Sequence, residues 1–374
     1  MTLRHFGIAL LAAAALLPLA GSCTKIEVAE ADSRVALDYN VALEQPYSLE
    51  QPQSKAPLTK AATAYSTSDT FKSYAWYLPN GKTWDNDKTD AAAYFSDVTV
   101  KFDTDNKWRG SDQKYYWPKL GSLSFWSYSP AKLAETNADK ISVTKDGVSL
   151  TGWTVNASTN QDIDFMVADF KSDLKTNTLT YGYQGVPTLF RHKLAKVTVQ
   201  ASVGKADEND KTKPADEVKI YKVSFKKVYT TGNFTMTQPT QDTKATESWS
   251  DRNNLQEIVI YENTNGLELN LTAQNVTLIG TDGNAKDLLA IPQVLNADSA
   301  RGTSGVSLYI EYSINGTKGT ADKALSDIKS QLWGIGQHIT YSVVFGKENE
   351  PIEFSGSVGD WGTGDSNDVY IGTE

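Results

Sequence analysis

Apolar and polar residues alternate along most of the chain with a period of two, which is the pattern of half-buried β-strands. The first clear case is the segment 35–43. Its apolar positions are Val35, Leu37, Tyr39, Val41 and Leu43. Similar alternation recurs at 267–271, 306–314, 341–345 and 352–354. Because successive side chains of a strand point to opposite faces, each segment is expected to bury one face.

Short turn signals separate these segments. Asn80-Gly81, Asp146-Gly147, Asp282-Gly283 and Asn315-Gly316 are dipeptides that accept positive φ and close hairpins. Helical periodicity is confined to two brief stretches, 130–137 and 323–332. The pattern therefore predicts an all-β protein, with two β-sandwiches in tandem.

Prolines mark the first boundary along the chain. Pro46, Pro52 and Pro57 punctuate the segment 44–59, and proline cannot donate to a sheet ladder, so this segment is expected to be an exposed loop. A second boundary is expected near Pro187, before a strand at 190–199. The expected parts are a signal segment at 1–22, a segment with the first strand and the loop at 23–60, an N-terminal sandwich at 61–187 and a C-terminal sandwich at 188–374.

The first 23 residues have the features of an export signal. Arg4 and His5 precede an apolar run at 8–20, which is too short to span a bilayer comfortably. Small residues then lead to Cys23, the single cysteine of the chain. A lone cysteine cannot form an internal disulfide. The arrangement resembles a bacterial lipobox, in which the cysteine receives a diacylglycerol and becomes the first residue of the mature protein. An ordinary signal peptide with a free thiol is the alternative.

Composition excludes some classes of function. The net charge is −9 and no stretch concentrates Lys and Arg, so we expect no nucleic-acid partner. His192 and His338 lack neighbours at metal-ligand spacing, and no phosphate loop or nucleophile motif is present. The acidic loops 85–87 and 103–105 lack the glycine and the terminal carboxylate of an EF-hand loop. We expect no catalytic residues, no metal site, no cofactor and no enzymatic activity.

Aromatic residues are abundant, with 9 Trp and 18 Tyr. We expect Trp117, Phe125 and Trp361 to be core residues, because large rings in β-proteins are mostly buried. The alternative is an exposed platform, such as Trp126 with Tyr128, that stacks on sugars or on another protein.

Several stretches together resemble the fimbrillin-like proteins of Bacteroidetes. They are Tyr116-Trp117-Pro118 with the segment 123–130, Asp164-Phe165-Met166-Val167-Ala168 with the segment 190–197, and the segment 333–341 with 352–354 and 358–361. Each stretch is short, but their order along the chain matches that of the family.

The resemblance implies two transthyretin-like β-sandwiches and a pilus subunit or accessory subunit that serves adhesion at the cell surface. Such proteins are lipoproteins carried to the outer membrane. A trypsin-like surface protease then removes the first strand, and a strand from another pilus subunit replaces it. The family's cleavage site commonly has arginine, where this chain has Lys60. Arg34 is the alternative, although a cut there would leave the first strand in place.

The residues support this mechanism independently of the resemblance. The strand 35–43 is amphipathic and is followed by the proline-rich loop, so it can plug a groove and still be removed. The segment 362–374 contains Val369 and Ile371 on one face, and we expect it to be a donor strand. The alternative function is a monomeric surface lipoprotein that binds glycans. A receptor on a host or bacterial surface fits either function.

The lipobox generates a direct prediction. Inhibition of lipoprotein signal peptidase should cause an unprocessed precursor to accumulate, because Cys23 carries the lipid that this peptidase requires. An immunoblot of cell envelopes measures the mass change. Normal processing of a Cys23→Ser variant would contradict the assignment.

Overall fold

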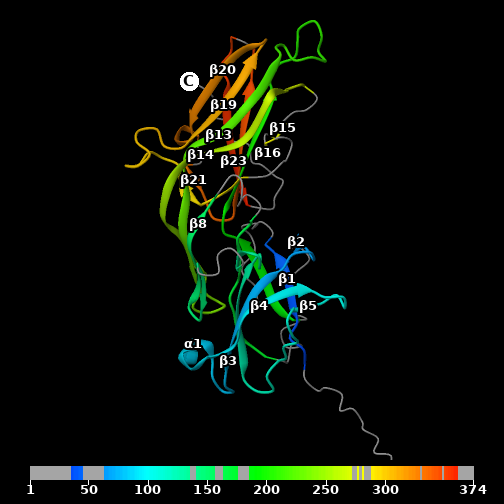
Figure 1. Ribbon diagram of the computed structural model, residues 1–374, viewed down its shortest axis with the longest axis vertical. Helices are drawn as coiled ribbons and strands as arrows, with labels where there is room; N and C mark the ends of the chain where they lie inside the picture. The colour runs from blue at the N-terminus through cyan, green and yellow to red at the C-terminus, as the bar shows by residue number, and fades with distance from the viewer. Residues whose placement is uncertain are drawn as a thin grey trace, which may run out of the picture. The chain divides into compact units, whose positions relative to one another are not determined.

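The computed structural model describes residues 35–44, 63–134, 140–155, 163–175, 185–271, 276–277, 280–281, 288–328, 331–347 and 349–360. Strands dominate these residues (Figure 1). The helical elements described are short: α1 (Trp84–Asp87) and the 3₁₀ turns η1 (Lys88–Asp90) and η3 (Leu325–Asp327). The all-β class is therefore confirmed.

The first sheet contains nine strands among the described residues and closes on itself. Its strands are β1 (Tyr39–Leu43), β2 (Thr63–Ala64), β3 (Phe71–Leu78), β4 (Ala92–Phe102), β5 (Trp108–Gly110), β6 (Ser122–Ser129), β9 (Met166–Ala168), β10 (Lys171–Leu174) and β11 (Val186–His192). Their order is β10-β6-β3-β4-β5-β1-β11-β9, with β2 beside β1. Because β9 also pairs with β6, the path from β6 through β1 returns to β6.

Two further sheets follow along the chain. The first has the order β15-β12-β22-β23, with β17 beside β12, and the second has the order β16-β14-β13-β19-β20, with the hairpin β7–β8 joined to β13. A small ladder pairs β18 with β21. The bounds are β7 (Ile141–Thr144), β8 (Gly147–Thr154), β12 (Ala195–Val203), β13 (Val218–Thr237), β14 (Thr246–Glu268), β15 (Val276–Thr277), β16 (Gly280–Thr281), β17 (Leu288–Ala290), β18 (Gln293–Val294), β19 (Ser307–Ile314), β20 (Thr317–Ala324), β21 (Leu332–Trp333), β22 (Gln337–Phe345) and β23 (Glu353–Asp360).

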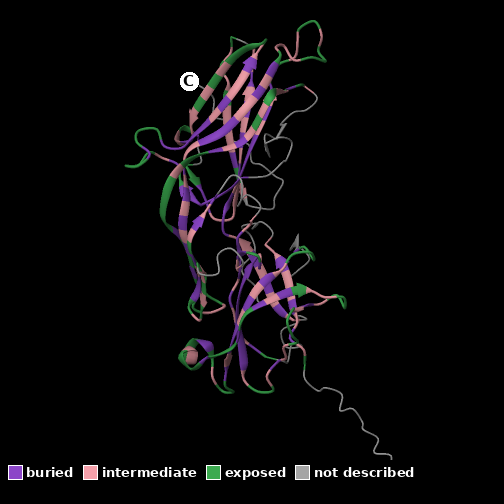
Figure 2. Cartoon of the chain, in the orientation of Figure 1, coloured by how far each residue is buried: buried purple, intermediate pink, exposed green. Residues whose placement is uncertain are grey.

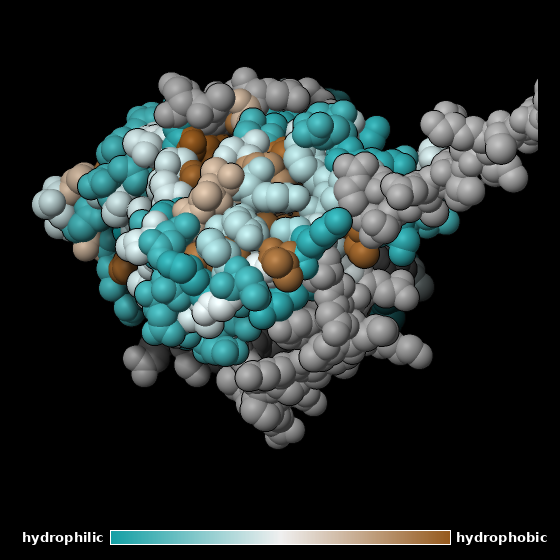
Figure 3. Space-filling view, turned by 90° about the horizontal axis from the view of Figure 1, so that it is seen from below, coloured by the Kyte–Doolittle hydropathy of each residue, from teal (hydrophilic) through white to brown (hydrophobic). Residues whose placement is uncertain are grey.

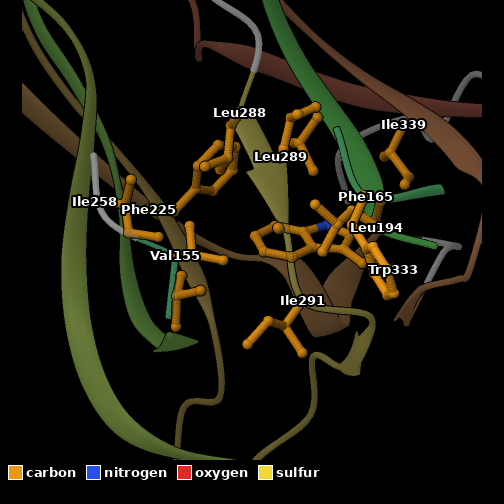
Figure 4. Close-up of a cluster of buried hydrophobic side chains, with 14 of the residues drawn as sticks. Val155, Phe165, Leu194, Phe225, Ile258, Leu288, Leu289, Ile291, Trp333 and Ile339 are labelled. Atoms are coloured by element: carbon orange, nitrogen blue, oxygen red, sulfur yellow. The ribbon is translucent and has the colours of Figure 1, made fainter. Parts of the chain in front are cut away.

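Two hydrophobic clusters hold these sheets together. One gathers the inner side chains of the closed sheet, including Phe71, Phe125 and Phe190. The other joins side chains of β12 and β22 to those of β13 and β19, so these two sheets share a core. Figure 4 shows Trp333 among the side chains of this second cluster, and its ring lies 5.3 Å from that of Phe225. The Trp333 indole nitrogen donates a hydrogen bond of 3.0 Å to the buried Tyr341 hydroxyl.

Burial alternates along the strands as the period-two pattern predicts (Figure 2). β22 is the clearest example, since Ile339, Tyr341, Val343 and Phe345 are buried and the residues between them are not. On the face of the molecule seen in Figure 3, hydrophilic residues predominate and apolar ones occur in small groups. This end of the molecule is therefore mainly polar.

The hairpin signals are partly confirmed. Asn315 and Gly316 have φ of 50° and 80° and join β19 to β20, and Asp146-Gly147 joins β7 to β8. The helix expected at 323–332 is wrong. Instead, β20 extends to Ala324 through its ladder with β19, followed by the turn η3 and the strand β21. Cross-strand hydrogen bonds and burial override a weak helical pattern. In the other expected helix, at 130–137, residues 133 and 134 are helical, and residues 135–137 lie outside the described ones.

The chain passes from the closed sheet to the next sheet between β11 and β12. The strand expected at 190–199 is broken there, because Lys193 turns inward and its amide donates to the Phe165 carbonyl at 2.9 Å. The Lys193 side chain is 1% exposed and pairs with Glu247 at 2.5 Å. The hairpin β7–β8, from the expected N-terminal sandwich, joins β13 of the following half. The division into parts at 61–187 and 188–374 stays a prediction.

The aromatic residues that the sequence analysis named are buried in the core, as far as the structure describes them. Trp117 and Phe125 are 6% and 2% exposed. Trp126 and Tyr128, the example of a platform, are fully buried, and Trp126 stacks on Phe170 at 4.8 Å. Trp361 lies outside the described residues.

Substitution of these rings is therefore expected to destabilise the fold. Trp117→Ala and Phe125→Ala should each lower the free energy of unfolding by about 3–5 kcal/mol, because each leaves a cavity in the closed sheet. Urea unfolding measures the loss. Leu120→Ala is the control, since Leu120 is 67% exposed and its truncation should change stability by less than about 0.5 kcal/mol. A stable Trp117→Ala variant would contradict the core assignment.

Candidate functional site

The first strand lies inside the closed sheet, not at an edge of it. β1 pairs in parallel with β11 over five positions, from Tyr39 opposite Val186 to Leu43 opposite Phe190. On its other side, β1 pairs antiparallel with β2 and meets β5 at Trp108. We call the place that β1 occupies between these neighbours the strand seat. It is the candidate functional site, because the sequence predicts that this strand can be removed.

Backbone hydrogen bonds hold both sides of the strand. On one side, the Val186 amide donates to the Asp38 carbonyl at 2.7 Å, and the Glu44 amide donates to the Phe190 carbonyl at 2.9 Å. On the other side, the Leu37 amide donates to the Tyr115 carbonyl at 2.8 Å. The segment therefore satisfies polar backbone groups of two separate neighbours at once.

The inner face of the segment fills the closed sheet. Leu37 and Tyr39 are 2% and 5% exposed, and Val41 and Leu43 pack against the same cluster with partial burial. Val35 departs from the expectation, since it lies before the strand and is 52% exposed. Each fully buried apolar side chain contributes about 1.5–3 kcal/mol relative to an exposed one. Leu37 and Tyr39 are therefore the main apolar contacts of the strand.

Tyr39 also provides a polar contact in the interior. Its hydroxyl donates a hydrogen bond of 3.0 Å to Ser73 Oγ, which in turn accepts one of 3.1 Å from Ser127 Oγ. Its ring packs edge-on against Phe71 and Phe125, at 5.4 and 6.2 Å. Burial raises the pKa of the Tyr39 hydroxyl far above its ordinary value, so the group stays neutral and can donate. A strand in the seat thus meets a specific hydrogen-bond acceptor in the core.

The outer face of the segment carries two carboxylates, each bound by an arginine. Arg109 Nε donates to Asp38 Oδ1 at 2.5 Å, and the Arg109 side chain is 17% exposed. Arg191 of β11 binds Glu44 and also donates to Asp169, with Nε–Oδ1 at 2.7 Å and Nη2–Oδ2 at 3.1 Å. The two ion pairs lie at the two ends of the strand.

The two arginines differ in their surroundings. The hydrogen bond to Asp38 raises the pKa of Arg109 above its ordinary value. Burial lowers the pKa of Arg191, and burial raises the pKa of its partner Asp169. Both guanidinium groups remain charged in the physiological range, because the ordinary pKa of arginine is so high. Each guanidinium also binds a carboxylate outside the strand, Asp105 for Arg109 and Asp169 for Arg191, so the seat presents two held charged hydrogen-bond donors to the occupying strand.

Gly185 allows β11 to approach the strand closely. Its φ is +100°, and a Cβ at this position would lie 2.7 Å from the Asp38 carbonyl oxygen. A contact this short is not compatible with a side chain. The glycine therefore supports the hydrogen bond between Val186 and Asp38 directly beside it.

The connection that follows β1 leads to β2, which pairs with β1 itself. Leu43 pairs with Thr63 and Ala42 with Ala64, so residues 45–62 must run from one strand to its neighbour. The predicted processing residue Lys60, its alternative Arg34, the lipidation residue Cys23 and the donor residues Val369 and Ile371 all lie outside the described residues. Their roles stay predictions.

Other candidate chemistry is accounted for by structural contacts. His192 Nδ1 lies 2.7 Å from Asp164 Oδ2, and His338 Nε2 lies 2.9 Å from Thr198 Oγ1. The segment 85–87 forms α1, where Asp87 binds the Thr83 amide. No group of three potential metal ligands occurs within the described parts of the chain. The helices described there are too short to span a membrane.

Sequence reasoning found the strand but missed most of its partners. Arg109, Arg191, Gly185 and Ser73 come from distant segments, and no local pattern brings them together. One available signal was the pair Asp38 and Glu44, which share the polar face of the strand six residues apart.

Comparison with solved structures places the fold among known proteins. A fimbrial protein from Bacteroides vulgatus has a TM-score of 0.56 at 16% identity, covering 87% of this chain and 99% of that chain. A candidate cell adhesion protein from Bacteroides uniformis has a TM-score of 0.49 at 18% identity, covering 88% and 100% of the two chains. The tip fimbrial protein Mfa3 from Porphyromonas gingivalis has a TM-score of 0.39 at 11% identity, covering 78% and 94%. The first of these supports a shared fold.

Sequence comparison identifies the family. No curated protein matches the chain significantly. The model of the fimbrillin-like family matches residues 59–361, which is most of the chain and includes nearly all of the described residues. The match begins just before Lys60 and therefore leaves out the first strand. This protein belongs to the fimbrillin-like family.

Proposed function

We propose that this protein is a subunit, or an accessory or tip subunit, of a cell-surface fimbria that serves adhesion. It assembles by exchange of its first strand after a trypsin-like surface protease cuts at Lys60. The observation that carries the proposal is the place of β1. It is an inner strand of the closed sheet, paired on both sides, yet it is joined to the following strand only through residues 45–62. A cut in that connection leaves β1 held by noncovalent contacts alone.

Departure of the strand would create two defects at once. The closed sheet would open, exposing unpaired backbone groups of β11 on one side and of β5 and β2 on the other. The cluster around Phe71 and Phe125 would lose Leu37 and Tyr39 and be left with a groove open to water. A strand from another subunit would pair these backbone groups and fill the groove, which is the physical basis of strand addition. The uncut protein is protected against this pairing.

The partners follow from the same scheme. The donor is the segment 362–374 of another subunit, with Val369 and Ile371 directed into the groove. Before the cut, the lipid on Cys23 holds the precursor at the outer membrane. After the cut, the lipid stays with the removed segment, so the trimmed subunit is free to join a polymer. Adhesion then requires a receptor on a host or bacterial surface.

A monomeric glycan-binding lipoprotein is the alternative function. Its best support is a groove of about 520 Å³ that contains two tyrosine rings together with amide, hydroxyl and charged groups. Tyr221, Lys222, Asn263, Tyr312 and Lys318 are among its lining residues. However, Lys318 Nζ lies 5.2 Å from the centre of the Tyr221 ring, and this cation competes with a sugar for the ring face. Strand exchange is therefore preferred.

Cleavage at Lys60 is the first test. Limited trypsin treatment of purified precursor should yield a product that starts at Ala61 and then forms oligomers resistant to SDS, because the vacated seat accepts a donor. N-terminal sequencing and unboiled gels measure the two steps. Deletion of residues 362–374 should permit cleavage and prevent oligomers.

The matched controls are substitutions at trypsin sites. Lys60→Ala should abolish the product that starts at Ala61, and Lys55→Ala/Lys60→Ala should block both trimming and assembly, because trypsin also cuts after Lys55 of the same connection. Arg34→Ala should block neither, since a cut at Arg34 leaves β1 in place. If the protein trimmed at Lys60 stays monomeric at high concentration, strand exchange fails and glycan binding becomes the better function.

Gly185 gives a second test, directed at the seat. Gly185→Ala should speed the release of the first segment from trimmed protein and lower precursor stability by about 1–3 kcal/mol, because the new Cβ collides with the Asp38 carbonyl. Size-exclusion chromatography of the trimmed complex measures release. Gly81→Ala is the control, since Gly81 has a similar φ of +86° with no atom near the added Cβ. Equal behaviour of the two variants would show that the close approach to β1 is unimportant.

A further inference from the structure

The two arginines of the strand seat have no role in the proposal above, which concerns the apolar face of the strand. Arg109 and Arg191 bind the carboxylates of Asp38 and Glu44 at the two ends of the segment. Both arginine side chains are mostly buried, at 17% and 22% exposure. Charge-assisted hydrogen bonds in such surroundings are stronger than those on an open surface, and arginine binds carboxylates with defined geometry.

The structure fixes the spacing that an occupant of the seat must have. Asp38 and Glu44 are six residues apart and lie on the outer face, while Tyr39 and Val41 between them face inward. Ala42 is 7% exposed, lying between Ala64 and Leu189 in the ladders, so this position accepts only a small residue. From position 38 to position 44, the seated strand therefore reads: acid, inward apolar residue, any residue, inward apolar residue, small residue, partly buried inward residue, acid.

The segment 368–374 of the same chain meets this requirement. It reads Asp368-Val369-Tyr370-Ile371-Gly372-Thr373-Glu374, whereas the seated strand reads Asp38-Tyr39-Asn40-Val41-Ala42-Leu43-Glu44. Aligning Asp368 with Asp38 also aligns Glu374 with Glu44, Gly372 with Ala42, and Val369 and Ile371 with Tyr39 and Val41. A shift by two residues would keep the apolar face inward but would move both acids away from the arginines.

We propose that Arg109 and Arg191 set the register and the selectivity of strand exchange, and that residues 368–374 of a second copy of this chain are the strand they select. The inference rests on the proposed function and adds to it. Asp368 binds Arg109, Glu374 binds Arg191, and Ile371 takes the position of Val41 opposite Thr188. Asn367 and Thr373 replace Leu37 and Leu43, so the donor buries less apolar surface and depends more on its two ion pairs.

The test uses protein made as the full chain with Cys23→Ser and then trimmed at Lys60. The further changes are confined to the donor segment, so the acceptor fold is untouched. Asp368→Asn and Glu374→Gln should each slow assembly into SDS-resistant oligomers by about tenfold, because each removes one charge-assisted pair. Asp365→Asn is the matched control. Asp365 aligns with the exposed Val35, where neither arginine contact is made, so its removal should have no effect.

The spacing between the two acids of the donor is tested without changing its composition. The double variant Thr373→Glu/Glu374→Thr keeps the charge and the residues but places the acids five apart on opposite faces of the strand. It should assemble as slowly as Glu374→Gln. Equal assembly of this variant, of Asp368→Asn and of the control would overturn the selective role of the arginines.

Register is tested by disulfide capture. Trimmed acceptors with Thr188→Cys are mixed with donors carrying Val369→Cys, Ile371→Cys or Thr373→Cys, and no other cysteine is present after trimming. Crosslinking is expected through Ile371→Cys. Dominant crosslinking through either of the other two would overturn the register. If the parent protein, trimmed but otherwise unchanged, does not assemble, the proposed function fails and this inference fails with it, which separates the two cases.

Discussion

A strand in the middle of a closed sheet must satisfy two neighbours at once, and this constraint governs the first half of the molecule. β1 provides hydrogen-bond partners to β11 on one side and to β2, β5 and the segment around Tyr115 on the other. The same strand places Leu37 and Tyr39 in the only direction that fills the core. Sheet closure and core filling therefore both depend on one short segment, the segment that the proposed function removes.

The seat has specific polar contacts in addition to its apolar ones. The hydroxyl of Tyr39 reaches Ser73 in the interior, and the carboxylates of Asp38 and Glu44 reach Arg109 and Arg191 outside. Buried polar groups are costly when they lose their partners, so they discriminate between strands more sharply than apolar surface does. A groove lined only by apolar residues would accept many strands in several registers. The two arginine pairs penalise a slipped strand at both of its ends, whereas the contact with Ser73 is made by the first strand alone, because the donor has Val369 at the position of Tyr39.

The sequence predicted the class of the fold and the position of the first strand, because both depend on local alternation of side chains. The pattern predicted a first strand at 35–43, of which Tyr39–Leu43 is strand, together with the hairpin at Asn315-Gly316 and the burial of Trp117 and Phe125. The helix at 323–332 was wrong, since pairing of β20 with β19 outweighed its periodicity. The arginines of the seat could not be found, because parallel pairing of β1 with β11 joins segments nearly 150 residues apart.

The parallel pairing of β1 with β11 has a mechanical consequence. In the proposed exchange, a donor strand that enters the seat in this direction would be pulled from its N-terminal end, where it leaves its own subunit, while β11 continues at its C-terminal end into β12. Tension between the two subunits then acts along both strands in opposite directions. Every hydrogen bond of the ladder shares that load together, in shear, whereas an antiparallel arrangement pulled at one end would open bond by bond like a zip. A junction loaded in shear ruptures only when many of its bonds give way together, which suits the fimbrial role proposed above.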